Sequence, residues 1–140
     1  YWHRFYDFSP DLNFSHPPVR EEVRTVMRFW LELGFAGYRV DAAPFLGEAP
    51  AGSNASPTPR AEILGDMRAT ATAMRDDAVL LAEAAEAPKE AAGYVLGGRG
   101  VQMLFDFYLN NHFFLALARE SAEPLRRALG ELPHLVPEAQ

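Results

Sequence analysis

Apolar side chains recur along this chain with two different spacings. Between Pro17 and Gly34, and again between Arg60 and Arg75, they fall on one face of a helix, which predicts two amphipathic helices. Proline suits the first turn of a helix and glycine the position after its last turn, so Pro17 and Gly34 indicate the two ends of the first helix.

Short continuous apolar runs lie between and after these helices and predict buried strands. They cover residues 35–42, 79–82 and 101–107, and the last of them contains Asp106. Further helices are predicted at residues 89–96 and 111–129, the latter split near Pro124. This alternation of helices and strands predicts an α/β fold with parallel strands, either an open doubly wound sheet or an arc of an eight-stranded barrel.

Composition and charge narrow the classes of partner. Hydrophobic residues make up 49% and charged residues 23% of the 140, as in ordinary folded domains. Thirteen Lys and Arg against nineteen Asp and Glu give a net charge of −6 without a basic cluster, so we expect no nucleic-acid partner. There is no long apolar run and no signal-like start, so we expect no membrane partner and a cytoplasmic location, while the absence of cysteine leaves the redox compartment open. The aromatic-rich start at Tyr1 indicates a piece of a longer protein.

Charged side chains lie at the carboxyl ends of two predicted strands. Arg39 and Asp41 are two residues apart on one strand and share a face, while Glu83 ends the next strand. An ionised Asp beside a cation and a Glu that partial burial can keep protonated are the pair that retaining glycoside cleavage uses. The residues alone equally fit an ion pair that only supports the fold, and such pairs are the more common case. Phe45, in the loop after Asp41, is a candidate for the rim of a substrate site.

Three segments resemble motifs of glycoside hydrolase family 13, the α-amylase family, in the family's order. Residues 37–42 (GYRVDA) resemble its strand-four motif, residues 81–84 (LAEA) its strand-five motif, and residues 9–13 (SPDLN) an element near the end of its inserted domain B. The segments YWHRFY, PDLNF and MRFWLELG are most similar to the trehalose synthase-like branch, which isomerises maltose to trehalose.

The resemblance implies a fold and a mechanism. The fold is a partial (β/α)8 TIM barrel from the loop before the third barrel helix through the sixth helix, with residues 1–16 as the end of domain B and residues 17–140 as the central part of the barrel. Asp41 is then the nucleophile that forms a covalent glucosyl-enzyme and Glu83 the general acid/base. Arg39, which holds Asp41 ionised, and Phe45 are the expected substrate-binding residues.

Several alternatives stay open. The substrate is expected to be maltose or another α-glucoside, with isomerisation somewhat ahead of α-amylase or α-glucosidase hydrolysis. The family's third catalytic Asp is absent from this chain, so the chain alone could be inert. Ser9 and Ala85 replace longer polar residues of the family pattern, and Glu86 is a spare carboxylate.

Two further expectations concern the N-terminal segment. No cofactor is required for the chemistry, although the family resemblance leaves room for a structural calcium in the full-length enzyme, with Asp11 or Asn13 as oxygen ligands. The aromatic side chains of this segment could stack on sugar rings or, as is more common, simply pack the loop on the barrel. They are Trp2, Phe5, Tyr6 and Phe8.

Overall fold

The computed structural model describes residues 1–49 and 56–132, and it confirms the predicted alternation of helices and strands. The elements in chain order are α1 (Pro17–Glu32), β1 (Gly37–Val40), the 3-10 helix η1 (Ala43–Phe45), α2 (Arg60–Met74), β2 (Val79–Ala82), α3 (Pro88–Val95), β3 (Met103–Leu104), α4 (Phe107–Ala118) and α5 (Glu123–Glu131).

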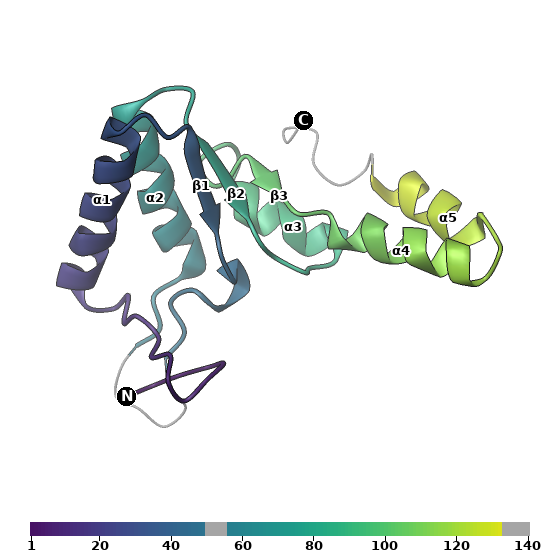
Figure 1. Cartoon of the computed structure of the whole chain (residues 1–140), viewed down its shortest axis with the longest axis horizontal. Coiled ribbons are helices and arrows are strands. Elements are labelled where there is room, and N and C mark those ends of the chain that lie inside the picture. Colours follow the sequence, from purple (N-terminus) through teal and green to yellow (C-terminus); the bar gives the residue numbers. More distant parts are fainter. Residues whose placement is uncertain (50–55, 133–140) are drawn as a thin grey trace.

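The three strands form one parallel sheet in the order β1-β2-β3, as Figure 1 shows. The register places Arg39 opposite Leu81 and Leu81 opposite Met103. Parallel neighbours joined by helices are the repeating unit of the predicted barrel arc. The register also brings the carboxyl ends of the strands to one edge of the sheet.

One face of the sheet carries the core and the other is open. Val40, Leu80 and Ala82 point to the covered face, where they join a single buried cluster with side chains of α1, α2 and α3. The opposite face carries Arg39 and Met103, and the Met103 side chain is 53% exposed. This asymmetry follows from the alternation of side chains along a strand.

Polar contacts fix α1 against its neighbours. The hydroxyl of Tyr38 on β1 donates a hydrogen bond to the carbonyl of Met27 on α1. Arg20 and Arg24 on α1 both reach Asp66 on α2, the second with an N–O distance of 3.2 Å. The helices and the sheet are therefore joined around the core by side chains far apart in the sequence.

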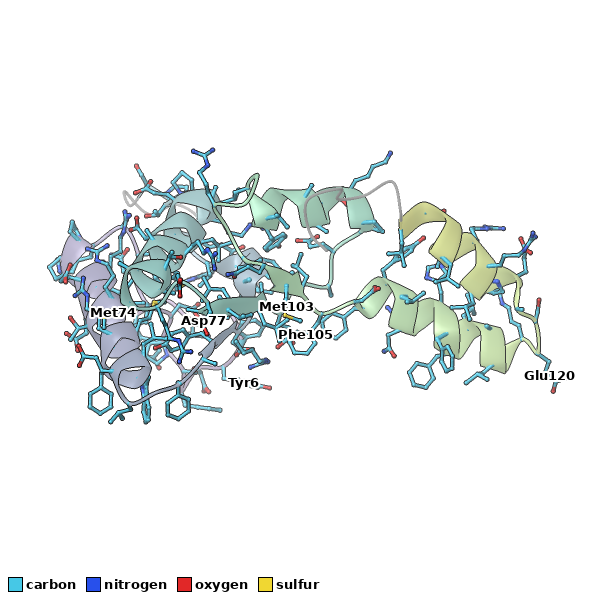
Figure 2. All side chains as sticks on the ribbon, turned by 90° about the horizontal axis from the view of Figure 1, so that it is seen from above. Tyr6, Met74, Asp77, Met103, Phe105 and Glu120 are labelled. Carbon is cyan, nitrogen blue, oxygen red and sulfur yellow. The ribbon has the colours of Figure 1, made fainter. Side chains whose placement is uncertain are left out.

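Helices α4 and α5 form a hairpin that projects from the body made by the sheet and the first three helices, and Glu120 lies at its far end (Figure 2). Positive φ at Glu120 (48°) accompanies the break between the two helices, which was predicted near Pro124. Helix α4 starts at Phe107 rather than at residue 111 because Asp106 caps it, accepting a hydrogen bond of 2.7 Å from the Leu109 amide.

The third strand is shorter than predicted. The apolar run over residues 101–107 contributes only Met103–Leu104 to the sheet. The Val101 amide donates to the carbonyl of Tyr94, which ties the start of the run to α3, and Asp106 at its end is a helix cap. The prediction that places Asp106 on a strand is therefore wrong, because the apolar run continues from a strand directly into a helix.

Candidate functional site

The two carboxylates singled out in the sequence lie side by side at the carboxyl edge of the sheet. Asp41 directly follows β1 and Glu83 directly follows β2, and the last paired residues of these strands are Val40 and Ala82. Backbone bonds continue past the strands: the Glu83 amide donates to the carbonyl of Val40 (2.9 Å), and the Ala43 amide donates to that of Glu83 (3.1 Å). The backbone pairing of β1 and β2 therefore continues past the ends of the strands and brings Asp41 and Glu83 next to each other.

Arg39 joins these carboxylates. Its Nη2 donates to Oδ1 of Asp41 at 2.7 Å and also contacts Oε2 of Glu83. Two hydrogen-bond-length contacts to one nitrogen keep the two carboxylate oxygens within about 6 Å of each other. Retaining glycosidases have their two carboxyl groups about 5 to 5.5 Å apart. Arg39 thus keeps the two carboxyl groups close together, as expected for the carboxylate pair of a retaining enzyme.

The solvent exposure of Arg39, Asp41 and Glu83 indicates how much their ion pairs stabilise the fold. The relative exposures are 51% for Arg39, 72% for Asp41 and 34% for Glu83. Ion pairs this exposed contribute little to stability, typically about 0–1 kcal/mol. These ion pairs therefore add little to the stability of the fold, and the three side chains stay accessible at the carboxyl edge of the sheet.

A strained turn directs the chain after Asp41. Ala42 adopts the left-handed conformation (φ 47°, ψ 39°), which costs about 1–2 kcal/mol for a residue with a Cβ. The turn leads into η1, which places Pro44 and Phe45 beside the carboxylates. Strain of this kind next to the expected nucleophile is common at functional sites.

A cavity of about 760 Å³ opens above the two carboxylates. This volume lies within the usual range for small-molecule sites, about 300–1,000 Å³. Acidic groups and aromatic rings share its wall, a combination that suits a sugar, whose hydroxyls and apolar ring faces need different partners. The lining side chains include Phe5, Tyr6, Asp41, Phe45, Glu83, Glu86 and Phe107.

Glu86, which lines the cavity, is hydrogen-bonded to a tyrosine on α3. The hydroxyl of Tyr94 on α3 donates to its Oε1 at 2.9 Å, and the Tyr94 side chain is fully buried. Burial, and secondarily the Glu86 carboxylate, raise the pKa of Tyr94 well above its usual value, so the phenol stays a donor. Arg60 lies over the Tyr94 ring, 4.1 Å from the centroid. Glu86 is therefore anchored to α3.

The structure brings together most of the residues predicted for the site. Asp41, Glu83 and Phe45 line one cavity, and Arg39 contacts both carboxylates from the open face of the sheet. The sequence did not suggest the contact between Arg39 and Glu83, which are 44 positions apart. It also did not suggest that Arg4 contacts Phe45 and Glu48 beside the cavity. The parallel register was the only signal that could have suggested the first contact.

Asp11 and Asn13 of the N-terminal segment are the residues for which the sequence leaves room for calcium binding. Within residues 1–49 and 56–132, no three His, Asp or Glu side chains are grouped so that they could hold a metal ion. The side-chain oxygen of Asn13 accepts hydrogen bonds from the amide and the hydroxyl of Ser15, at 3.1 and 2.6 Å. Calcium binding by the full-length enzyme stays a prediction from the family resemblance.

Residues 1–128 match the family model described as the α-amylase catalytic domain. The chain is 37% identical to "Trehalose synthase/amylase TreS" of Mycolicibacterium smegmatis over 147 residues, which is 100% of the chain and 24% of that protein. It is 37% identical to "Trehalose synthase" of Thermus thermophilus, with 100% of the chain and 15% of that protein covered.

Solved structures agree on the fold. The α-amylase from H. orenii superposes with a TM-score of 0.78 at 18% identity, covering 96% of this chain and 26% of that one. The chain thus spans about a quarter or less of the length of the curated relatives described above. No helix in the described part of the chain is long and apolar enough to cross a membrane.

Proposed function

Because this chain belongs to the α-amylase catalytic-domain family, glycoside hydrolase family 13, we propose that it supplies two catalytic carboxylates of a retaining α-glucosyl enzyme that acts on maltose or related α-glucosides. The observation that carries the proposal is the contact of Arg39 with both Asp41 and Glu83 beside one cavity. The activity belongs to the complete gene product, since the chain spans a fraction of its relatives.

In the first half of the reaction, a carboxylate oxygen of Asp41 attacks the anomeric carbon of the bound glucosyl unit. The bond from that carbon to the glycosidic oxygen breaks as Glu83 gives its proton to the leaving oxygen. The product is a covalent β-glucosyl ester on Asp41 and a released alcohol. Arg39 contacts both carboxylates and so holds them in position, and its cation stays beside both groups as charge moves from one to the other.

In the second half, Glu83, now a carboxylate, removes a proton from the acceptor hydroxyl as that oxygen attacks the anomeric carbon. The ester to Asp41 breaks and the α configuration returns. Water as acceptor gives hydrolysis. The released glucose, if it attacks through a different hydroxyl, gives an isomer of maltose.

Isomerisation to trehalose is the outcome that the relatives named trehalose synthase support, and hydrolysis is the second candidate, supported by the "amylase" in the name of the mycobacterial relative. The chain on its own is proposed to be inactive, because one face of its sheet is open. A cytoplasmic location and the absence of a required cofactor stay predictions from the sequence.

Two variants of the complete gene product test the proposal. With α-glucosyl fluoride, whose leaving group needs little protonation, Glu83→Gln should accumulate a glucosyl ester on Asp41, seen as a mass increase of one glucosyl unit on the peptide that contains Asp41. Asp41→Asn should show no ester and lose turnover of maltose. Asp77→Asn is the matched control, because Asp77 is an exposed acid paired with Arg75 just before β2, at the opposite edge of the sheet.

Two results would overturn the proposal. One is turnover of maltose by Asp41→Asn at the parental rate. The other is a glucosyl ester on a peptide that does not contain Asp41. Product analysis from maltose then separates the two outcomes: trehalose indicates isomerisation, and glucose alone indicates hydrolysis.

A further inference from the structure

The segment before α1 is folded on itself and forms one wall of the cavity. The Ser9 amide donates to the carbonyl of Tyr6 (3.0 Å), and the Asp11 amide donates to that of Trp2 (2.9 Å). Phe5 and Tyr6 from this segment line the cavity that contains Asp41 and Glu83. These side chains are largely exposed, so burial alone does not hold the segment in place.

Arg4 connects this segment to the loop that follows the nucleophile strand. Its Nη1 donates to Oε2 of Glu48 at 2.7 Å, and its guanidinium carbon lies 3.8 Å from the centroid of the Phe45 ring. Phe5 packs its ring edge-on to Phe45, with centroids 5.6 Å apart and an angle of 76° between the planes. Phe45 is therefore in contact with both Arg4 and Phe5 of this segment.

We propose that Arg4 is a positioning residue, which fixes Phe45 and the segment of residues 1–11 as adjoining walls of the sugar cavity and so sets how tightly an α-glucoside is bound. The proposal rests on the function proposed above. The guanidinium of Arg4 makes both the ion pair with Glu48 and the contact with the face of the Phe45 ring. A cation is attracted to an aromatic ring when it lies over the ring face in this way. A single substitution at Arg4 therefore releases both walls together.

The position of Phe45 predicts which kinetic constant responds. Phe45 lies on the cavity wall and carries no group that can exchange a proton or form a bond. A wall of this kind contacts the substrate and the transition state alike, so loosening it should raise KM and leave kcat nearly unchanged. An ion pair without a role at the site would leave both constants unchanged.

The test uses Arg4→Gln in the complete gene product, with two readouts. Hydrogen–deuterium exchange of peptides from residues 1–16 should become faster, because the Ser9 and Asp11 amides lose the support of Arg4. The KM for maltose should rise by about three- to tenfold while kcat stays within about twofold. Glu48→Gln breaks the ion pair and keeps the ring contact, so its effects should be smaller in the same direction.

The matched control is Arg126→Gln, which removes an exposed Arg–Glu pair on α5, away from the cavity. It should leave both readouts at the wild-type values. Unchanged hydrogen–deuterium exchange in Arg4→Gln would show that Arg4 does not hold the segment of residues 1–11 in place. Faster exchange with an unchanged KM would show that Arg4 does not position the wall for substrate binding. If the wild-type protein turns over no α-glucoside, the proposed function and the substrate role of Arg4 both fail, while the exchange experiment still decides whether Arg4 holds the segment.

Discussion

Arg39 on β1 contacts the carboxylate of Glu83 beyond the end of the neighbouring strand β2, in addition to Asp41 on its own strand. One cation thus serves two groups that have opposite tasks in the proposed mechanism. Asp41 has to remain ionised until it attacks, and Glu83 has to give up a proton and then recover one. The guanidinium contacts both carboxylates and so fixes their positions relative to each other through both steps.

Replacing Arg39 with Lys should lower kcat/KM for maltose by about 100-fold in the complete gene product. The ammonium of lysine is a compact point charge without the planar fork of guanidinium, so it should not hold both carboxylates in the same geometry. Circular dichroism should show an unchanged fold, because all three side chains are at least one-third exposed. A rate within about twofold of the wild type would contradict this role for Arg39.

Glu86→Gln should cost less than about tenfold in kcat, whereas Glu83→Gln should cost about 1,000-fold on maltose. The amide oxygen of the new side chain can still accept the hydrogen bond that Tyr94 donates to Glu86, so the loop keeps its anchor. Steady-state kinetics of the two variants decide between the carboxylates. The reverse order of effects would identify Glu86 as the general acid.

Gly37→Ala should destabilise the fold by about 1–3 kcal/mol. A Cβ at residue 37 would lie 1.9 Å from the backbone carbonyl oxygen of Val79 on the neighbouring strand, which cannot move aside without breaking the sheet. Gly65→Ala, in the interior of α2, has open space around the new Cβ and should stabilise by about 0.5–1 kcal/mol. Urea unfolding of both variants measures the free energy of unfolding, which should fall in Gly37→Ala and rise in Gly65→Ala.

Asp106→Ala should destabilise α4 by about 1 kcal/mol, because it removes the acceptor for the Leu109 amide at the first turn. Asp106→Asn keeps a capping oxygen and should retain most of this stability. Thermal unfolding compares the two. Equal midpoints for the Ala variant and the wild type would show that the cap does not stabilise the helix.

The fold should lose stability at alkaline pH through the buried Tyr94 and the partly buried Tyr38. Burial is the largest cause that raises the pKa of Tyr94 and of Tyr38, so both phenols stay neutral in the folded state after they ionise in the unfolded state, near pH 10. Their contribution is present in full below about pH 10 and is lost as the pH rises toward the folded-state pKa. Denaturant midpoints measured from about pH 8 to 11 should fall less steeply in Tyr94→Phe.

The helix and strand order of the chain was predictable because each element has its own local signal. Pro17 begins α1 as its position predicts, and positive φ at Gly34 (99°) follows the end of the helix. The third strand was predicted too long, since Phe105 and Phe107 extend an apolar run whose end is set by a single hydrogen bond from the backbone to Asp106. Side-chain spacing does not reveal such a cap when the residues on both sides are apolar.

The candidate site was predictable only in part. Asp41 and Glu83 follow apolar strands, and parallel pairing then forces them to one edge of the sheet. The Arg4 contacts with Phe45 and Glu48 depend on how a loop without regular structure folds back across the sheet edge, and no periodic pattern encodes that path. Long-range contacts between loops are therefore the part of the site that needed the structure.

The order of the strands in the sheet also has a consequence for how the molecule is built. Each of β1, β2 and β3 pairs only with strands that neighbour it in the chain, so each strand after β1 finds a partner that has already been translated. Nascent chains emerge N-terminal end first, at about 5–20 residues per second. Once β2 has left the ribosome and docked on β1, Asp41 and Glu83 can lie at the same edge of the sheet before α4 and α5 have emerged.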